Sequence, residues 1–113
     1  MRRFALILLL LAGPLRAEDW VPLSGAEISA ALTDRALEYV SGDAWQDFRA
    51  SGRTLYIYKG RESWGYWRVE NDRYCSQWPP SDLWACYRLE ARAGAVRFVG
   101  EAADDISVAT YAE

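Results

Sequence analysis

Acidic side chains are the residues of this chain best able to do acid–base chemistry. The sequence has 16 of them and no histidine, so the commonest general base and metal ligand is missing. Paired carboxylates can hydrolyse glycosides, and the candidates are Asp104 with Asp105, Asp43 with Asp47, and Glu62. Adjacent residues of a strand point to opposite faces, so Asp104 and Asp105 could not share a site there. We therefore expect binding rather than catalysis.

Other catalytic and cofactor motifs are missing as well. Serine nucleophiles have no histidine partner, and neither G-x-G-x-x-G nor G-x-x-x-x-G-K-[ST] occurs. No loop has the spacing of a calcium site. With 113 residues, the chain is too short for a nucleotide-binding domain plus a substrate domain. We expect no cofactor and no metal.

Cys75 and Cys86, eleven positions apart, are the only cysteines. A redox catalyst or a zinc site would need a C-x-x-C pair or further ligands. In an oxidising compartment the simplest interpretation is one structural disulfide, worth about 3 kcal/mol for so short a loop.

The first 17 residues have the layout of a secretory signal. Arg2 and Arg3 precede the apolar run 4–12, and Ala17 is a small residue at the expected cleavage point. The run is about half the roughly 20 apolar residues of a membrane span, although an uncleaved anchor is the alternative. We expect a signal peptide over 1–17 and one small β-rich domain over 18–113, located in the periplasm or secreted.

The net charge of the mature chain limits the classes of partner that it can bind. Removing residues 1–17 takes away three of 13 basic residues and none of 16 acidic ones, leaving a net charge of −6. Phosphate backbones favour clustered positive charge. We therefore expect no nucleic acid and no membrane insertion, but a protein or glycan of the cell envelope.

One helix followed by strands should position these side chains. Ser24 and Glu27 have capping-box spacing, Leu23 can pack on Ile28, and Leu32 follows on the same face, which predicts a helix over 25–33. Alternating Tyr-, Trp- and Val-rich segments are then interrupted by turn residues every eight to twelve positions. The predicted strands are 35–41, 44–49, 53–59, 64–70, 73–78, 84–90, 95–100 and 105–111. We predict a mainly β (α+β) domain, a small curled antiparallel sheet or barrel.

Two independent constraints set the register of the middle strands. A two-residue turn at Asn71-Asp72 places Arg68 opposite Cys75, and a Cys75–Cys86 bond places Tyr74 opposite Tyr87. Both give the same alternation. The predicted core face comprises Trp67, Val69, Tyr74, Ser76, Ala85, Tyr87 and Leu89, joined from other strands by Leu55, Ile57, Val96, Phe98, Ile106 and Val108. The predicted outer face comprises Trp64, Tyr66, Arg68, Arg73, Cys75, Gln77, Trp84, Cys86, Arg88 and Glu90.

Six tryptophans are the most prominent feature of the composition. Trp67 and Trp45 are expected to fill the thin core. Trp64, Tyr66 and Trp84 are instead expected outside, beside Arg68, Arg73 and Arg88. There the arginines either shield the rings or form a binding patch with them.

The segment 78–83 joins the two cysteine-bearing strands. Pro79 and Pro80 stiffen it, and the disulfide ties its base. A stiff loop displaying Trp78 would lose little entropy on binding. The same loop could equally cap the end of a barrel.

The turn Ser51-Gly52-Arg53 has two interpretations. Glycine at the special backbone position is typical of a plain hairpin turn. The segment also resembles the Ser-Gly loop of periplasmic lysozyme inhibitors, which are small exported β-barrels with a disulfide. That resemblance implies that Ser51, Gly52 and Arg53 would enter the lysozyme cleft.

A longer resemblance rests on residues 63–70, 74–80 and 85–87, which read W-G-x-W-x-V…C-x-x-W-P…C-Y. They resemble a family of small exported Gram-negative bacterial proteins of unknown function, and the likeness covers most of the mature chain. Some members carry the name dihydrodipicolinate reductase, which implies a nicotinamide-dependent enzyme of lysine synthesis. Such an enzyme needs a Gly-rich dinucleotide fold.

We therefore hypothesise first a non-enzymatic binding module. Inhibition of an enzyme such as lysozyme is the second hypothesis, and the reductase is the third. A cavity inside the barrel would favour small apolar ligands over surface recognition.

Overall fold

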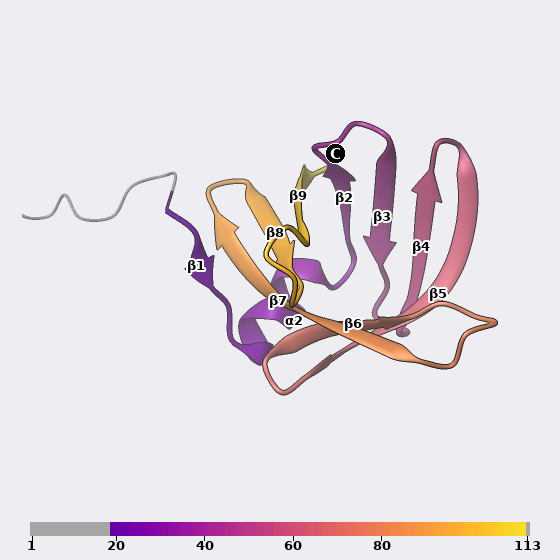
Figure 1. The fold of residues 1–113 in the computed structure, drawn as a ribbon, viewed down its shortest axis with the longest axis horizontal. Helices are drawn as coiled ribbons and strands as arrows, with labels where there is room; N and C mark the ends of the chain where they lie inside the picture. The colour runs from indigo at the N-terminus through magenta and orange to yellow at the C-terminus, as the bar shows by residue number, and fades with distance from the viewer. Residues whose placement is uncertain (1–18, 113) are drawn as a thin grey trace, which may run out of the picture.

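Short antiparallel strands wind into a closed barrel that carries one helix (Figure 1). The computed structural model describes residues 19–112, and the predicted signal segment 1–17 lies outside the described residues. The elements are β1 (Val21–Pro22), α2 (Gly25–Leu32), β2 (Arg35–Tyr39), β3 (Ala44–Phe48), β4 (Arg53–Tyr58), β5 (Arg61–Glu70), β6 (Arg73–Gln77), β7 (Trp84–Arg92), β8 (Ala95–Val99) and β9 (Ile106–Tyr111).

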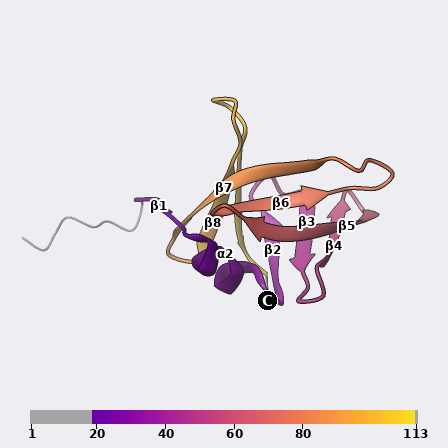
Figure 2. The ribbon, with the colours of Figure 1, turned by 90° about the horizontal axis from the view of Figure 1, so that it is seen from below.

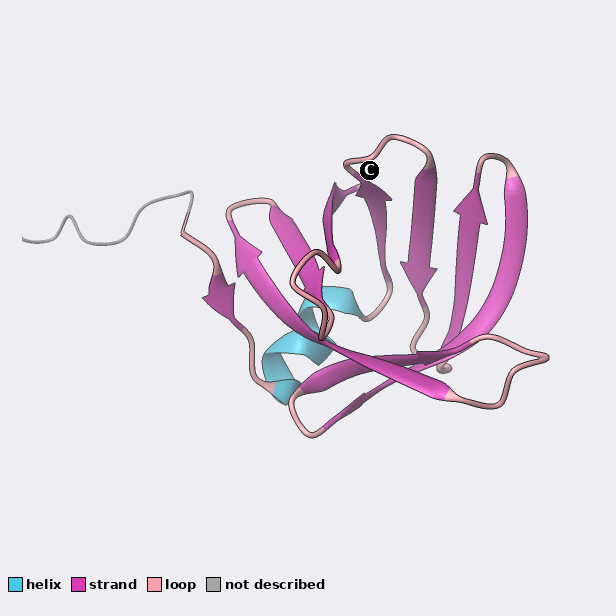
Figure 3. Ribbon diagram, in the orientation of Figure 1, coloured by secondary structure: helices cyan, strands magenta, loops and turns pink. Residues whose placement is uncertain are grey.

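Each strand from β2 to β9 pairs with the next along the chain, and β9 pairs with β2 to close an eight-stranded barrel. The predicted mainly β fold is confirmed, as are the positions of all eight predicted strands (Figure 3). The sequence analysis missed β1, which pairs with the end of β7 at Val21 and Ala91. This pairing directs the chain toward α2.

The helix α2 begins at a capping box, as predicted. The Glu27 amide donates to Ser24 Oγ at 3.3 Å, and the Ser24 amide donates to Glu27 Oε1 at 2.8 Å. The helix ends at Leu32, and both Ile28 and Leu32 are fully buried. Asp72 accepts a hydrogen bond from the Gly25 amide at 2.6 Å, which ties the helix to the β5–β6 turn. The helix therefore fills one end of the barrel.

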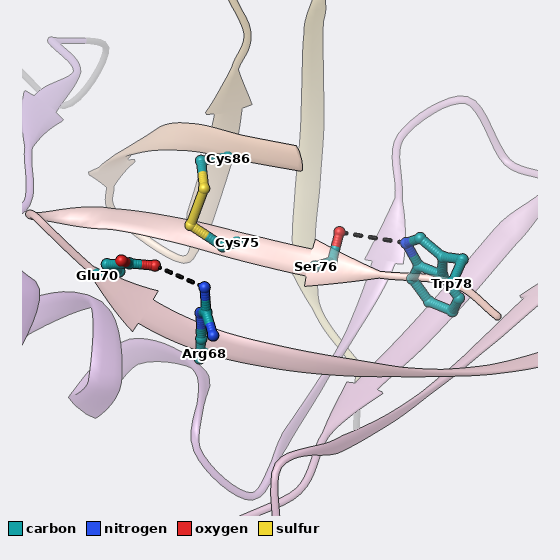
Figure 4. The surroundings of a disulfide bond; sticks show 6 residues. All are labelled: Arg68, Glu70, Cys75, Ser76, Trp78 and Cys86. Atoms are coloured by element: carbon teal, nitrogen blue, oxygen red, sulfur yellow. Dashed lines mark hydrogen bonds and ion pairs between the residues drawn. A yellow bond between two sulfur atoms is a disulfide. The ribbon is translucent and has the colours of Figure 1, made fainter. Parts of the chain in front are cut away.

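The predicted register of the middle strands is confirmed. Asn71 and Asp72 both have positive φ, as a two-residue hairpin turn requires. Arg68 lies opposite Cys75, and Cys75 lies opposite Cys86, to which it is joined by a disulfide. Figure 4 shows this bond linking β6 to β7.

The inward side chains form one core next to the helix. It contains Ile28, Leu32, Leu37, Phe48, Trp67, Tyr74, Leu89, Val96, Phe98 and Ala109. Phe48 contacts both Trp67 and Tyr74 edge-on, with ring centroids 5.7 Å apart in each case. The predicted inward positions of Trp67, Val96 and Phe98 are confirmed.

The prediction of which side chains face the core was wrong by one position in β4 and in β9. Leu55 pairs with Trp64 and Ile57 with Glu62, so both take outward positions. Ile106 pairs with Val99, and Val108 pairs with Arg97. Val99 and Arg97 alternate along β8 with the inward residues Val96 and Phe98, so Ile106 and Val108 take outward positions. The inward positions are taken by Thr54 and Tyr56 in β4 and by Ser107, Ala109 and Tyr111 in β9.

The predicted core position of Trp45 was also wrong. Trp45 pairs with Ile57 across β3 and β4 and therefore lies on the outer face, where it is half-buried. Gln46, its neighbour, takes the inward position and is buried. Ala85, by contrast, has the inward phase but is exposed, because it lies beyond the packed part of the core.

Several outward positions are nevertheless buried, namely Leu55, Cys75, Glu90 and Ala95. Glu90 is only 9% exposed, because Arg97 Nε lies 2.6 Å from its Oε1. Cys75 is fully buried on the outer face. Its cover comes from Arg68 on β5 and Trp84 on β7, which meet across β6 with the guanidinium carbon 3.9 Å from the ring centroid.

Candidate functional site

The barrel is filled at one end and hollow at the other. Figure 2 shows α2 and the long β8–β9 connection at opposite ends of the molecule. Toward the β8–β9 end the interior contains a cavity of about 940 Å³, within the 300–1,000 Å³ typical of small-ligand sites. Its inward-facing lining includes Tyr39, Gln46, Tyr56, Ser63, Tyr74, Ser76, Trp78, Tyr87, Phe98 and Ser107.

Aromatic rings form the walls of this cavity. The Tyr39 and Tyr56 centroids are 6.1 Å apart with their planes at 74°, and those of Tyr56 and Trp78 are 5.9 Å apart at 63°. Tyr39 also contacts Phe98 at 6.0 Å. Edge-on contacts of this kind also pack the core around Phe48, so the distinguishing feature of Tyr39, Tyr56 and Trp78 is that all three line the cavity.

A buried polar network lies on the barrel interior around Gln46. The Tyr39 hydroxyl donates to Gln46 Oε1 at 2.7 Å, and Gln46 Nε2 donates to Thr54 Oγ1 at 2.9 Å and to the Tyr74 hydroxyl at 3.3 Å. The amide is therefore satisfied on both sides. Burial raises the pKa of Tyr39 far above its ordinary value and that of Tyr74 to about 12. Both phenols stay neutral at physiological pH.

Two of the four tyrosines that line the cavity have hydroxyls without a hydrogen bond in the described part of the chain. Tyr56 and Tyr87 both line the cavity, and neither hydroxyl makes a hydrogen bond within residues 19–112. A ligand could use these groups as donors or acceptors.

Trp78 lies at the mouth of the cavity and faces inward. Its indole nitrogen donates to Ser76 Oγ at 3.1 Å, as Figure 4 shows. Its ring packs on Gly65, where an added Cβ would lie 2.5 Å from Trp78 Cε3. The ring therefore forms part of the cavity wall, and the two predicted roles of the 78–83 loop, binding and capping, both stay predictions.

The outer aromatic residues are covered by arginines. The guanidinium groups of Arg49 and Arg53 lie 4.7 and 4.8 Å from the Trp64 ring centroid, and Arg53 also lies 5.4 Å from Tyr66. Trp64 and Tyr66 remain 39% and 41% exposed. The outward positions of Trp64 and Tyr66 were predicted correctly. The arginines over their rings are Arg49 and Arg53, and not the arginines that were predicted to lie beside them.

The arginines named from the sequence have separate contacts. Arg68 covers Trp84 and forms an ion pair with Glu70 at 2.9 Å. Arg88 lies 3.8 Å from Glu90. Arg73 is exposed and lies opposite Glu70 in the β5–β6 pair. These side chains lie on the same face as Trp64 and Tyr66, whereas Trp78 does not.

Ser51, Gly52 and Arg53 form a tight hairpin turn between β3 and β4. Gly52 has a φ of +94°, and its amide donates to the Arg49 carbonyl at 2.9 Å. The turn lies at the helix-filled end of the barrel, because the Phe48 carbonyl accepts from Asp34, just after α2. Arg53 is engaged with Trp64. Entry of this turn into a lysozyme cleft stays a prediction.

The acidic candidates are not brought together in the predicted pairs, although Glu62 and Asp105 both line the cavity. Asp47 pairs with Arg49 at 2.9 Å on the outer face, whereas Asp43 lies in the β2–β3 turn. Asp104 and Asp105 lie in the β8–β9 connection and not in a strand. No cluster of three or more His, Cys, Asp or Glu side chains suited to a metal occurs among residues 19–112.

The sequence analysis missed the cavity-forming role of Tyr39, Gln46 and Tyr56. The signal was present in the β4–β5 turn. A two-residue turn at Lys59-Gly60, which the structure shows, places Leu55 opposite Trp64. With Trp64 outward, Leu55 must also be outward, which turns Tyr56 into the barrel.

Comparisons with known proteins identify no relative. No family model, curated protein or solved structure matches the chain. No helix within the described residues is long and apolar enough to cross a bilayer.

Proposed function

We propose that this protein is a non-enzymatic binding module of the periplasm or the extracellular space, and that its ligand is a small molecule held in the barrel cavity. The supporting observation is the cavity itself, about 940 Å³ in volume, open at one end and walled by aromatic rings. The lining combines aromatic rings with hydroxyls, an amide and two carboxylates, and a concave site with convergent polar groups is typical of ligand sites.

The proposed location rests on two features. Residues 1–17 have the pattern of a secretory signal. The Cys75–Cys86 disulfide is the kind of bond that persists in oxidising compartments. Both features favour export.

The cavity is a better candidate than the outer aromatic surface. Trp64 and Trp84 already have guanidinium groups over their rings, so a partner would have to displace Arg53 or Arg68 to stack there. The Tyr56 and Tyr87 hydroxyls in the cavity make no hydrogen bond within the described chain and need no such displacement.

Matched variants of β9 test this proposal. Ser107 lines the cavity, whereas Thr110, three residues on, is exposed with the outward phase. Phenol and indole, two neutral ring probes, are titrated by calorimetry into the wild-type protein and into Ser107→Trp and Thr110→Trp. We expect saturable binding to the wild type and to Thr110→Trp, and its loss in Ser107→Trp, whose new ring fills the cavity.

Equal binding by both variants would move the site out of the cavity and onto the surface. Absence of saturable binding of every small-molecule probe by the wild type, whether neutral or cationic, would contradict the proposal. The thermal transition of each variant shows that it is folded before binding is measured.

A further inference from the structure

The charges of the molecule are unevenly distributed between the barrel interior and its surface. The residues lining the cavity include two carboxylates, Glu62 and Asp105, and no lysine or arginine in the described part of the chain. Arginines lie over Trp84 and Trp20 on the outer surface, over Tyr111 beside α2, and over Trp64, whose ring also borders the cavity. An anionic ligand would therefore find no counter-charge inside.

The nearest basic residues do not reverse this pattern. Lys59 and Arg61 flank the β4–β5 turn, but neither lines the cavity. Lys59 lies over the Tyr58 ring, with its Nζ 5.3 Å from the ring centroid. Both side chains are exposed to solvent, as Glu62 and Asp105 are, so the difference between these charges is that only the two carboxylates line the cavity.

The cavity walls have the features of a cation site. Tyr39, Tyr56 and Trp78 all line the cavity, and the Tyr56 ring meets those of Tyr39 and Trp78 at 74° and 63°. Aromatic faces attract a cation most strongly when water is excluded, and groups of tyrosine and tryptophan recognise quaternary ammonium ligands. Because burial raises the pKa of Tyr39 and of Tyr74, these rings remain uncharged phenols.

We infer that the cavity is a site for an organic cation, with a quaternary ammonium group against Tyr39, Tyr56 and Trp78 and with Glu62 and Asp105 supplying negative charge at the lining. This inference rests on the proposed function, because it names the ligand class for the same cavity. A quaternary ammonium group has no N–H donors. It therefore needs no acceptors from Gln46, whose amide is already used within the protein.

Two probes of nearly equal shape isolate the charge. Choline carries a trimethylammonium group, and 3,3-dimethylbutan-1-ol replaces it with a neutral tert-butyl group. Titration calorimetry at constant ionic strength compares their dissociation constants. We expect choline to bind at least tenfold more tightly than the alcohol, because only the cation gains from the ring faces and the carboxylates.

Variants show whether the rings carry the preference. Trp78→Leu and Tyr56→Leu each keep an apolar side chain but remove an aromatic face, and both should reduce the choline preference at least threefold. Trp84→Leu removes a ring from the outer surface, where Trp84 contacts Arg68, and should leave the preference unchanged. Two cavity variants are used so that misfolding of one leaves the other informative.

Equal or weaker binding of choline relative to the alcohol, or no binding of choline, would overturn the inference. If phenol and indole still bind in the cavity, the proposed function stands and only the ligand class is wrong. If neither the ring probes nor choline bind, both proposals fail.

Discussion

The two ends of the barrel are built from the same strands but differ in what fills them. At one end Ile28 and Leu32 of α2 are fully buried beside Phe48 and Leu89. At the other end no helix of residues 19–112 enters, and Tyr39, Tyr56 and Trp78 line a cavity. The closed end has the dense apolar packing of a protein core, whereas the open end has aromatic rings and hydroxyls around a cavity.

This difference suggests a division of labour along one axis. Packing against α2 supplies stability, and the disulfide pins β6 to β7. The open end then keeps rings such as Tyr56 without the packing that would otherwise fill the space. Changes at the closed end should therefore affect mainly folding, and changes at the open end mainly binding.

Shortening a helix residue at the closed end should have the largest effect. Leu32→Ala should reduce the free energy of unfolding by about 2–5 kcal/mol, because a fully buried side chain leaves a cavity that the barrel cannot collapse. Denaturant titration measures it. Ile106→Ala, at an exposed outward position of β9, is the control and should change stability by less than about 0.5 kcal/mol. Similar losses for the two variants would remove the distinction between the ends.

Removing the disulfide should have the next largest effect. The double substitution Cys75→Ser and Cys86→Ser should reduce stability by about 3 kcal/mol, because the unfolded chain regains the freedom that the crosslink removes. Thermal unfolding of the oxidised protein and the variant measures this. A variant as stable as the wild type would show that the hydrogen bonds between β6 and β7 alone fix their register.

Raising the pH above 10 should reduce the free energy of unfolding through the buried phenols. The pKa of Tyr74 is raised by burial from 10.0 to about 12, so the unfolded state loses this proton first as the pH rises. This contribution to stability is complete below pH 10, falls by up to about 1.4 kcal/mol per pH unit, and is lost by pH 12. The raised pKa of Tyr39 acts in the same direction.

Unfolding curves at a series of alkaline pH values test this dependence. Tyr74→Phe should make the free energy of unfolding decrease less steeply with pH. Tyr66→Phe, on the outer face, should leave that slope unchanged. An unchanged slope in Tyr74→Phe would show that this phenol ionises as readily in the folded state as in the unfolded state.

The helix cap should have the smallest effect. Ser24→Ala removes the acceptor of the Glu27 amide and should reduce stability by about 1 kcal/mol. Denaturant titration measures the free energy of unfolding of this variant and of Ser81→Ala. Ser81 lies in the β6–β7 loop at the open end and serves as the comparison. A larger loss from Ser81→Ala would mean that the open end contributes more stability than its packing indicates.

Local signals were enough to predict most of the fold. The Ser24–Glu27 capping box located the helix, and the Asn71-Asp72 turn with the cysteine pair fixed the middle register. The prediction failed where greater hydrophobicity suggested the wrong face. Leu55 and Ile57 are more apolar than Thr54 and Tyr56, yet pairing with β5 turns the latter pair inward.

The candidate site was harder to predict than the fold. Trp78 was selected from the sequence, but its inward direction depends on close packing against Gly65 from a different strand. Gln46 was missed because its burial depends on Tyr39, Thr54 and Tyr74, which the sequence places on three other strands. A cavity reflects what the neighbouring side chains fail to fill, and no local pattern encodes it.

The indole N–H resonances of the six tryptophans test the central claim most directly. Choline or indole is added to the isotope-labelled protein, and nitrogen–proton correlation spectra are assigned through single tryptophan substitutions. If the cavity is the ligand site, the Trp78 signal shifts saturably, because its N–H bonds Ser76 at the mouth, while the Trp84 signal on the outer face stays in place. A saturable shift of Trp84 with an unmoved Trp78 would contradict the account and place recognition on the outer surface.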